Sequence, residues 1–159
     1  MTVRPTRFAL TNHRFDTAEE RDAFRRDRLE PVARFLHEHL DRFGDPIEQI
    51  RACLLRASGD GGADGGTVTV AEDEDAGEIV GVVVTNDTHM AGYVPENLLV
   101  YVAAHRERRG QGIGAAVMRA AIDGCEGAIA LHVESDNPAV KLYEKLGFTN
   151  KYLEMRLTR

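Results

Sequence analysis

The chain has 159 residues, of which 43% are hydrophobic and 29% are charged, and its formal net charge at pH 7 is -6. These values are typical of a globular domain, and the negative charge argues against nucleic acid as the main partner. No apolar run reaches the roughly 20 residues that span a membrane, and the N-terminus lacks the apolar stretch of a signal peptide. The two cysteines, Cys53 and Cys125, have neither the spacing nor the neighbours of a metal site. We therefore expect a single cytoplasmic domain over residues 1–159 that holds no metal.

The N-terminal part of the chain has the hydrophobic period of helices. A first helix is predicted to begin after Asp16 or Thr17, either of which is a good N-cap residue ahead of the acidic residues of a first helical turn. Pro31 interrupts the pattern, which resumes as a second amphipathic helix, and a third short helix is predicted from Pro46. Ahead of these helices, the segment RFAL at residues 7–10 is suited to an additional strand.

Beyond a glycine-rich loop at residues 58–66, the hydrophobic period changes to two, which is typical of strands. The elements predicted next are strands over 67–73 and 78–85 joined as a hairpin by EDAG, a strand over 97–105, a helix from about Gly112 to Gly124, and a strand over 128–134. A change from helices to strands, and then to alternating strands and helices, indicates an α/β protein of the α+β type, in which helices cover a sheet.

The last part of the chain is predicted to contain a short helix and a final strand. In the segment NPAVKLYEKLGF, Asn137 is suited to the N-cap, Pro138 to the first helical position and Gly147 to the position just after the helix. The segment KYLEMRL at residues 151–157 alternates apolar and charged residues, so it is predicted to close the sheet as a strand.

Three glycines, Gly110, Gly112 and Gly114, stand where an apolar strand gives way to a predicted helix. The N-terminus of a helix presents unpaired N–H groups and the positive end of the helix dipole, so it suits an anion. Glycines have no Cβ to hold a phosphate away from these groups, and Arg108 and Arg109 add positive charge nearby. The residues predict a phosphate or pyrophosphate site, and the alternative is a tight strand-to-helix turn.

Two common phosphate-binding motifs fit this segment poorly. The P-loop needs GxxxxGK[ST], and no Lys-Ser or Lys-Thr pair follows a glycine in this chain. The dinucleotide fingerprint needs G-x-G-x-x-G, whereas the spacing here is G-x-G-x-G. An unrelated phosphate-binding α/β domain remains a third interpretation of the sequence.

The segment RGQGIG at residues 109–114 matches the R/Q-x-x-G-x-G/A signature of the GCN5-related N-acetyltransferases, the GNAT superfamily. The segment NPAVKLYEKLGF at residues 137–148 resembles the C-terminal motif of the same superfamily, in which a tyrosine precedes a Gly-Phe pair by a helical turn. The resemblance covers roughly residues 67–157. It implies a central mixed, mostly antiparallel sheet flanked by helices, with a variable helical part over about 1–57 and a cofactor-binding core over about 67–159.

The resemblance implies acetyl-coenzyme A as the co-substrate, bound where two neighbouring parallel strands separate. The amide-rich pantetheine arm would pair with the backbone of Val102, Ala103 and Ala104. The residues placed at the pyrophosphate are Arg109, Gly110, Gln111, Gly112, Ile113, Gly114 and Ala115. A superfamily asparagine near the start of the C-terminal helix often contacts the cofactor, and Asn137 is its candidate. Counting along the motif gives Asp136 instead, so the choice between these two side chains stays open.

The superfamily transfers an acetyl group by direct attack of an amine in a ternary complex, which requires a base for the amine and an acid for the departing thiolate. Tyr143 occupies the position of the acid, although its helical spacing also suits a core residue. Glu96, near the start of the strand before the glycine segment, is the candidate base. His132 on the next strand is the alternative base and, together with Tyr93, a candidate substrate-binding residue.

The acceptor is expected to be a primary amine of a small cationic metabolite, because residues 86–97 offer an acidic and aromatic lining. The alternatives are a protein N-terminus or lysine as the acceptor, or a non-catalytic module that binds coenzyme A. No nucleic acid or membrane partner is expected. A homodimer is compatible with the sequence, and residues 151–157 are a candidate contact.

Overall fold

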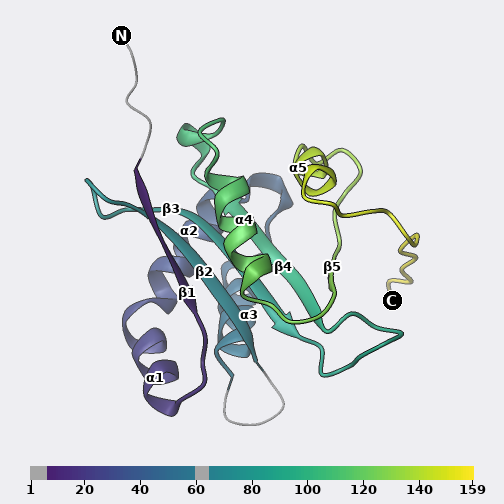
Figure 1. Ribbon diagram of the computed structural model, residues 1–159, viewed down its shortest axis with the longest axis horizontal. Helices are drawn as coiled ribbons and strands as arrows, with labels where there is room; N and C mark the ends of the chain where they lie inside the picture. Colours follow the sequence, from purple (N-terminus) through teal and green to yellow (C-terminus); the bar gives the residue numbers. More distant parts are fainter. Residues whose placement is uncertain (1–6, 60–64) are drawn as a thin grey trace.

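The computed structural model describes residues 7–59 and 65–159, which form a five-stranded sheet in the order β1-β2-β3-β4-β5 (Figure 1). The strands are β1 (Phe8–His13), β2 (Gly66–Asp73), β3 (Ile79–Asp87), β4 (Asn97–Ala104) and β5 (Ile129–Leu131). Neighbours from β1 to β4 are antiparallel, whereas β5 is parallel to β4. The mixed, mostly antiparallel sheet is therefore confirmed, and so is the additional strand expected at RFAL.

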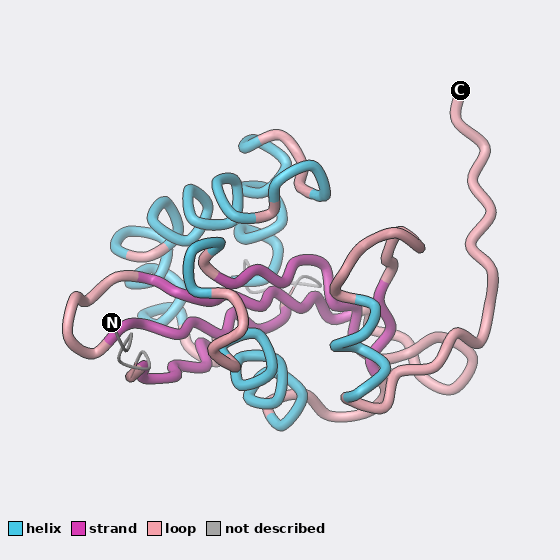
Figure 2. The backbone as a smooth tube through the Cα atoms, turned by 90° about the horizontal axis from the view of Figure 1, so that it is seen from above, coloured by secondary structure: helices cyan, strands magenta, loops and turns pink. Residues whose placement is uncertain are grey.

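Helices cover both faces of this sheet, as Figure 2 shows from above. The helices of the first face are α1 (Ala18–Asp27), α2 (Leu29–His39) and α3 (Ile47–Ser58), with the 3-10 turn η1 (Asp41–Phe43) between α2 and α3. The helices of the second face are α4 (Ile113–Asp123) and α5 (Val140–Lys145), and the 3-10 turn η2 (Arg106–Arg108) precedes α4. The sheet is thus the middle of three layers, and its central strands are shielded from water on both sides.

The core explains why β3 reads as a continuous apolar run in the sequence. Val82 and Val84 are fully buried against the α1–α3 layer, whereas Val83 is fully buried against α4 and α5. Successive side chains of a strand point to opposite faces, so a strand covered on both faces needs apolar residues at every position.

Local signals set the ends of the N-terminal helices. Thr17 caps α1, because its hydroxyl accepts from the Glu20 N–H at 3.2 Å while the Glu20 carboxylate accepts from the Thr17 N–H at 3.1 Å. The break before α2 falls at Arg28, so Pro31 lies in the first turn of α2 rather than between two helices. A proline costs little there, because N–H groups of the first turn have no partner within the helix.

The prediction of a strand over residues 151–157 is wrong. This segment forms no strand, and it leaves the body of the protein at the C-terminal end (Figures 1 and 2). Its large apolar side chains are 77–92% exposed: Tyr152, Leu153, Met155 and Leu157. Alternation of apolar and charged residues is a local property, whereas a strand also needs a neighbouring strand for its backbone hydrogen bonds. Two further elements are shorter than predicted, since β5 ends at Leu131 and α5 begins at Val140.

Candidate functional site

The parallel strands β4 and β5 separate shortly after they meet. They pair only over Asn97–Leu99 and Ile129–Leu131, after which β5 ends and β4 continues to Ala104. A β-bulge marks the point of separation, because Leu99 and Tyr101 lie opposite consecutive residues of β3 and Val100 is the extra residue. The C-terminal half of β4 therefore has no partner strand on this side among the described residues, and we refer to the region beside it as the opening.

Backbone groups of β4 face this opening. The His105 N–H donates to the Val80 carbonyl of β3 at 2.8 Å. Backbone groups of an antiparallel strand alternate between its two sides, so the N–H and C=O of Val102 and Ala104 face away from β3. Ala103 is different, because its backbone groups face β3. Its side chain is buried in the core between the sheet and helices α1–α3. Of the three residues predicted for the pantetheine arm, Val102 and Ala104 present backbone groups that pair with no other strand in the described part of the chain.

The glycine segment has the conformation of an anion cradle. Gly110 and Gly112 have φ angles of +81° and +80°, which L side chains rarely adopt. Gly112 is the N-cap of α4, and no side chain caps this helix. The Ala116 N–H makes the first helical bond, to the Gly112 carbonyl at 3.0 Å, so the N–H groups of residues 113–115 precede the helical ladder. A Cβ added at either left-handed glycine would meet no atom within 4 Å, which leaves room for a phosphate at the positive end of the helix.

The side chain of Ile113 is buried, so only its backbone lies at the glycine segment. Its side chain is 1% exposed and packs with Ala71 and Val80 in a small core cluster. Gly114 faces α5, where an added Cβ would lie in ordinary contact, 3.5 Å from Leu142. The buried isoleucine anchors the first turn of α4 on the sheet, so the N–H groups of the cradle are held in a fixed direction.

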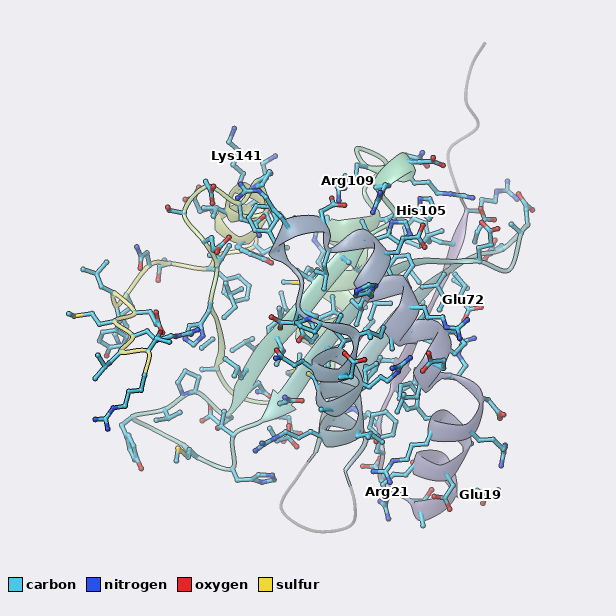
Figure 3. All side chains as sticks on the ribbon, turned by 180° about the vertical axis from the view of Figure 1, so that it is seen from behind. Glu19, Arg21, Glu72, His105, Arg109 and Lys141 are labelled. Carbon is cyan, nitrogen blue, oxygen red and sulfur yellow. The ribbon has the colours of Figure 1, made fainter. Side chains whose placement is uncertain are left out.

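Arg109 is hydrogen-bonded to the C-terminal end of α2 and to the turn that follows it. Its guanidinium donates to Asp41 Oδ2 at 3.0 Å and to the His39 carbonyl at 3.3 Å. Arg106 contacts the same carboxylate at 3.0 Å and also donates to the Glu38 carbonyl. Figure 3 shows Arg109 and His105 at the same end of the molecule as Lys141 of α5. The arginine predicted for the phosphate is therefore held beside the glycine segment by an aspartate about 70 positions away in the sequence.

Arg108 is directed toward the β2–β3 hairpin. It forms an ion pair with Asp73, whose side chain is largely buried, and a longer contact with Glu78 at 3.6 Å. The pKa of Asp73 is held below its ordinary value by the N–H groups of Ala76 and Asp75 and by Arg108. This arginine stabilises the turn before the glycine segment, and Gln111 lies half-buried inside that segment.

Tyr143 lies on α5, with its ring in the core between the sheet and helices α4 and α5. The side chain is 7% exposed, and its ring centroid is 5.9 Å from that of Phe148 in an edge-to-face arrangement. Burial raises the pKa of Tyr143 to about 12, so the hydroxyl keeps its proton at neutral pH. Within the part of the chain that the structure describes, no residue hydrogen-bonds this hydroxyl. A protonated hydroxyl without a protein partner is available to donate to a bound ligand.

Glu96 fastens the beginning of β4 to the segment before β5. Its carboxylate accepts from the Ala128 N–H at 2.7 Å, and a Cβ at Gly127 would lie only 2.6 Å from it. The Ala128 N–H, together with the Glu96 N–H, lowers the pKa of this carboxyl. A lowered pKa weakens a carboxylate as a proton acceptor, so the geometry favours a structural role at the closed end of the opening.

The other predicted side chains lie on different segments of the chain. His132 is exposed and follows β5 directly, whereas Tyr93 is 86% exposed in the loop between β3 and β4. Asp136 forms an ion pair with Arg42 at 2.7 Å, which lowers the pKa of Asp136. Asn137 Oδ1 accepts from the Ala139 N–H at 2.9 Å and so caps the turn that leads into α5. Among the described residues, no hydrogen bond or ion pair joins Glu96, His132 or Tyr93 to Tyr143.

Sequence reasoning missed the turn between α2 and α3, residues 41–45. Asp41 binds Arg109, Arg42 binds Asp136, and the Tyr101 hydroxyl of β4 donates to Asp45 at 2.5 Å. Ion pairs between residues so far apart in the chain leave no periodic signal. The one local hint is Asp41 itself, since a positive φ of 53° is uncommon for a residue other than glycine but is accessible to Asp.

The buried His39, which packs against His105 beside the same turn, predicts a loss of stability in acid. His39 is 4% exposed, its Nδ1 accepts from the Arg106 N–H at 3.1 Å, and its ring centroid is 4.3 Å from that of His105. Burial and the neighbouring His105 lower the pKa of His39, so the unfolded chain binds a proton here more readily than the folded protein. The free energy of unfolding should therefore fall as the pH drops below the ordinary histidine pKa of about 6.5.

The variant His39→Asn keeps a hydrogen-bond acceptor but cannot be protonated. We expect its free energy of unfolding, measured in urea at about pH 7 and about pH 5.5, to fall less than that of the unaltered protein. Part of the pH dependence should persist, because burial also lowers the pKa of His13. Equal losses in the two proteins would show that His39 does not contribute.

No group of three or more His, Cys, Asp or Glu side chains in residues 7–59 and 65–159 is arranged to hold a metal ion. No helix in these ranges is long and apolar enough to cross a membrane.

A parallel strand pair that separates beside a glycine-led helix is the arrangement that the resemblance to the GNAT acyltransferases implies. Residues 64–150 match the family model described as an acetyltransferase (GNAT) domain. The match covers more than half of the chain, so the chain belongs to the GNAT acetyltransferase family and is an acyltransferase. No curated protein sequence matches the chain significantly.

Solved structures support the fold. The chain is 17% identical to ribosomal-protein-alanine N-acetyltransferase from Brucella melitensis biovar Abortus 2308, covering 96% of this chain and all of that one, with a TM-score of 0.64. It is 15% identical to the aminoglycoside N-acetyltransferase AAC(6')-Iy in complex with CoA, covering 100% and 99% of the two chains, with a TM-score of 0.66. A putative acetyl transferase from Pyrococcus furiosus is 24% identical, with coverages of 96% and 100% and a TM-score of 0.59.

Proposed function

We propose that this GNAT acetyltransferase transfers the acetyl group of acetyl-coenzyme A to a primary amine of a small cationic metabolite, by direct attack in a ternary complex. The observation that carries the proposal is the opening where β4 and β5 separate, which adjoins the uncapped N-terminus of α4. Bound acetyl-coenzyme A supplies the activated acetyl group as a thioester. A solved relative of the same fold is an aminoglycoside N-acetyltransferase in complex with CoA, which supports an amine as the acceptor.

Different residues of this chain bind different parts of acetyl-coenzyme A. The free backbone groups of Val102 and Ala104 orient the pantetheine arm as an added strand would be oriented. The N–H groups of residues 113–115 bind the pyrophosphate, and Arg109 adds positive charge at the rim of the cradle. A backbone N–H of β4 that faces the opening stabilises the oxyanion that develops on the acetyl group.

Proton transfer is assigned to side chains around the opening. Tyr143 donates its proton to the thiolate that leaves when the thioester breaks, because its raised pKa keeps the hydroxyl protonated. The base is Glu96 or His132. The bond from the Ala128 N–H to Glu96 favours His132, whose exposed side chain follows β5. Asn137 holds the turn that positions α5 and therefore Tyr143.

A protein substrate is the second candidate. The similarity in fold to a ribosomal-protein-alanine N-acetyltransferase favours a protein N-terminus as the acceptor, and a protein lysine belongs to the same alternative. A module that binds coenzyme A without catalysis is the other alternative. It would retain the glycine segment, and its binding of coenzyme A would not depend on the Tyr143 hydroxyl. We also propose a cytoplasmic location, supported by the two free cysteines, and a homodimer that would cover the exposed C-terminal segment.

Binding of acetyl-coenzyme A is the first test of this function. At 100 times its dissociation constant, a ligand that binds only the folded state stabilises it by about 2.7 kcal/mol, which raises the melting temperature of a domain this size by several degrees. We expect a saturable shift in a thermal-denaturation titration with acetyl-coenzyme A and a much smaller one with ATP. An equal response to ATP would indicate a general phosphate site, and no response to either ligand would contradict the proposed function.

A further inference from the structure

The turn of residues 41–45 contacts three sides of the opening between β4 and β5. Asp41 binds Arg109 at the glycine segment, and Arg42 binds Asp136 in the segment that follows β5. Asp45 accepts a hydrogen bond from Tyr101 of β4. These contacts place the turn across the side of β4 that faces α1–α3, next to the half of the strand that β5 leaves unpaired. An acceptor that approaches β4 from this layer would meet the turn.

The β-bulge of β4 directs Tyr101 toward the turn. Val100 and Tyr101 both pack on the α1–α3 side, although consecutive residues of a regular strand would point to opposite faces. The Tyr101 ring is 7% exposed, and its hydroxyl lies 2.5 Å from Asp45 Oδ2. Burial and the Asp45 carboxylate raise the pKa of Tyr101, so the hydroxyl remains a donor. The Tyr101 hydroxyl thereby fixes the orientation of the exposed Asp45 carboxylate.

Asp45 retains capacity for a second partner. An ionised carboxylate has about four acceptor positions, and in the described part of the chain Tyr101 is its one hydrogen-bond partner. The neighbouring Arg42 is already paired with Asp136 and lies over the Phe43 ring at 4.3 Å. Glu48, in the first turn of α3, adds another negative charge. Asp45 and Glu48 therefore make one end of the turn acidic, while Arg106 and Arg109 share the Asp41 carboxylate at its other end.

We infer that Asp45 binds an ammonium group of the acceptor, with Tyr101 as the positioning residue that holds the carboxylate. The reacting nitrogen must be neutral, because a protonated amine has no lone pair with which to attack. The group bound by Asp45 is therefore a second amino group that keeps its charge. This inference rests on the proposed function and narrows its substrate class to small molecules with at least two amino groups.

A diamine and the matching monoamine test this assignment. Acetylation of 1,4-diaminobutane and of butylamine is followed by release of the coenzyme A thiol, with the unaltered protein and with Asp45→Asn. We expect the unaltered protein to prefer the diamine by about tenfold or more in kcat/KM, as one charged contact would give. In Asp45→Asn the preference should disappear through a higher KM for the diamine, while the KM for acetyl-coenzyme A and the rate with butylamine stay the same.

Two further variants separate this effect from general changes in charge or folding. Glu48→Gln removes a negative charge from the same side but keeps the carboxylate that Tyr101 holds, so it should lower the preference by a smaller factor than Asp45→Asn. Tyr101→Phe keeps the Asp45 charge but frees its orientation, so the KM for the diamine should rise by a smaller factor. Circular dichroism confirms that each variant is folded.

The outcomes distinguish the inference from the function on which it rests. If Asp45→Asn keeps the preference for the diamine, or if the unaltered protein has none, the assignment of Asp45 is wrong although the transferase remains. If neither amine is acetylated while acetyl-coenzyme A still stabilises the protein, the small-amine function and the inference are both overturned.

Discussion

Replacing Gly112 by alanine should weaken the binding of acetyl-coenzyme A by about tenfold or more, because hydrogen bonds to a charged group contribute about 1.5–3 kcal/mol and about 1.4 kcal/mol is a factor of ten. The added Cβ would stand in the empty space next to the first N–H groups of α4, where the phosphate oxygens need to approach. The φ of +80° also strains any L side chain at this position, so the free energy of unfolding should fall by about 1–2 kcal/mol. Isothermal titration calorimetry and urea unfolding measure the two effects separately.

The chain contains a matched control for this variant. Gly77, in the turn of the β2–β3 hairpin, has a similar φ of +70°, and an added Cβ there also meets no atom within 4 Å. Gly77→Ala should lower the free energy of unfolding by a similar amount and leave the affinity for acetyl-coenzyme A unchanged. If Gly112→Ala lost no more affinity than Gly77→Ala, the glycine segment would be a tight turn rather than a phosphate cradle.

The variant Tyr143→Phe should lower kcat by about a hundredfold or more, which is the usual contribution of a general acid. The affinity for acetyl-coenzyme A should change little, because the ring remains beside Phe148 in the core between the sheet and helices α4 and α5. The free energy of unfolding should also change little, since no described residue bonds the hydroxyl that is removed. Steady-state rates of thiol release and a calorimetric titration measure kcat and the affinity.

A tyrosine outside the site provides the comparison. Tyr152 lies in the exposed C-terminal segment at 77% exposure, so Tyr152→Phe removes a hydroxyl without touching the opening or the core. Its turnover should equal that of the unaltered protein. Equal turnover in Tyr143→Phe as well would mean that Tyr143 only packs against its neighbours, and the assignment of the acid would have to be withdrawn.

The parts of the fold that depend on local patterns could be predicted from the sequence. The hairpin of β2 and β3, the uninterrupted apolar run of β3 and the capping of α1 by Thr17 all follow from residues close together in the chain. The glycine segment belongs to the same group, because the need for left-handed φ angles and a free helix N-terminus is expressed within a few residues. The motif match then supplied the family and the mixed sheet.

The parts that depend on distant partners could not be predicted in this way. Residues 151–157 have the alternation of a strand, but no neighbouring strand pairs with them. Arg109 has the position of a phosphate ligand, yet its partner Asp41 lies in another layer of the protein. Glu96 resembles a base in sequence position, whereas its carboxylate is bonded to the Ala128 N–H across the sheet. In each case the deciding contact is set by tertiary packing, which leaves no trace in the spacing of residues.

The turn of residues 41–45 has a consequence for protein engineering. A chimera with another member of the family is an informative experiment, and a convenient crossover point would be the segment before β2. Such a crossover would separate Asp41 from Arg106 and Arg109, Arg42 from Asp136, and Asp45 from Tyr101. Two domains of the same fold would then be joined with four mismatched contacts around one opening. A functional graft would have to transfer this turn and its four partner residues as one unit, whatever their distance in the sequence.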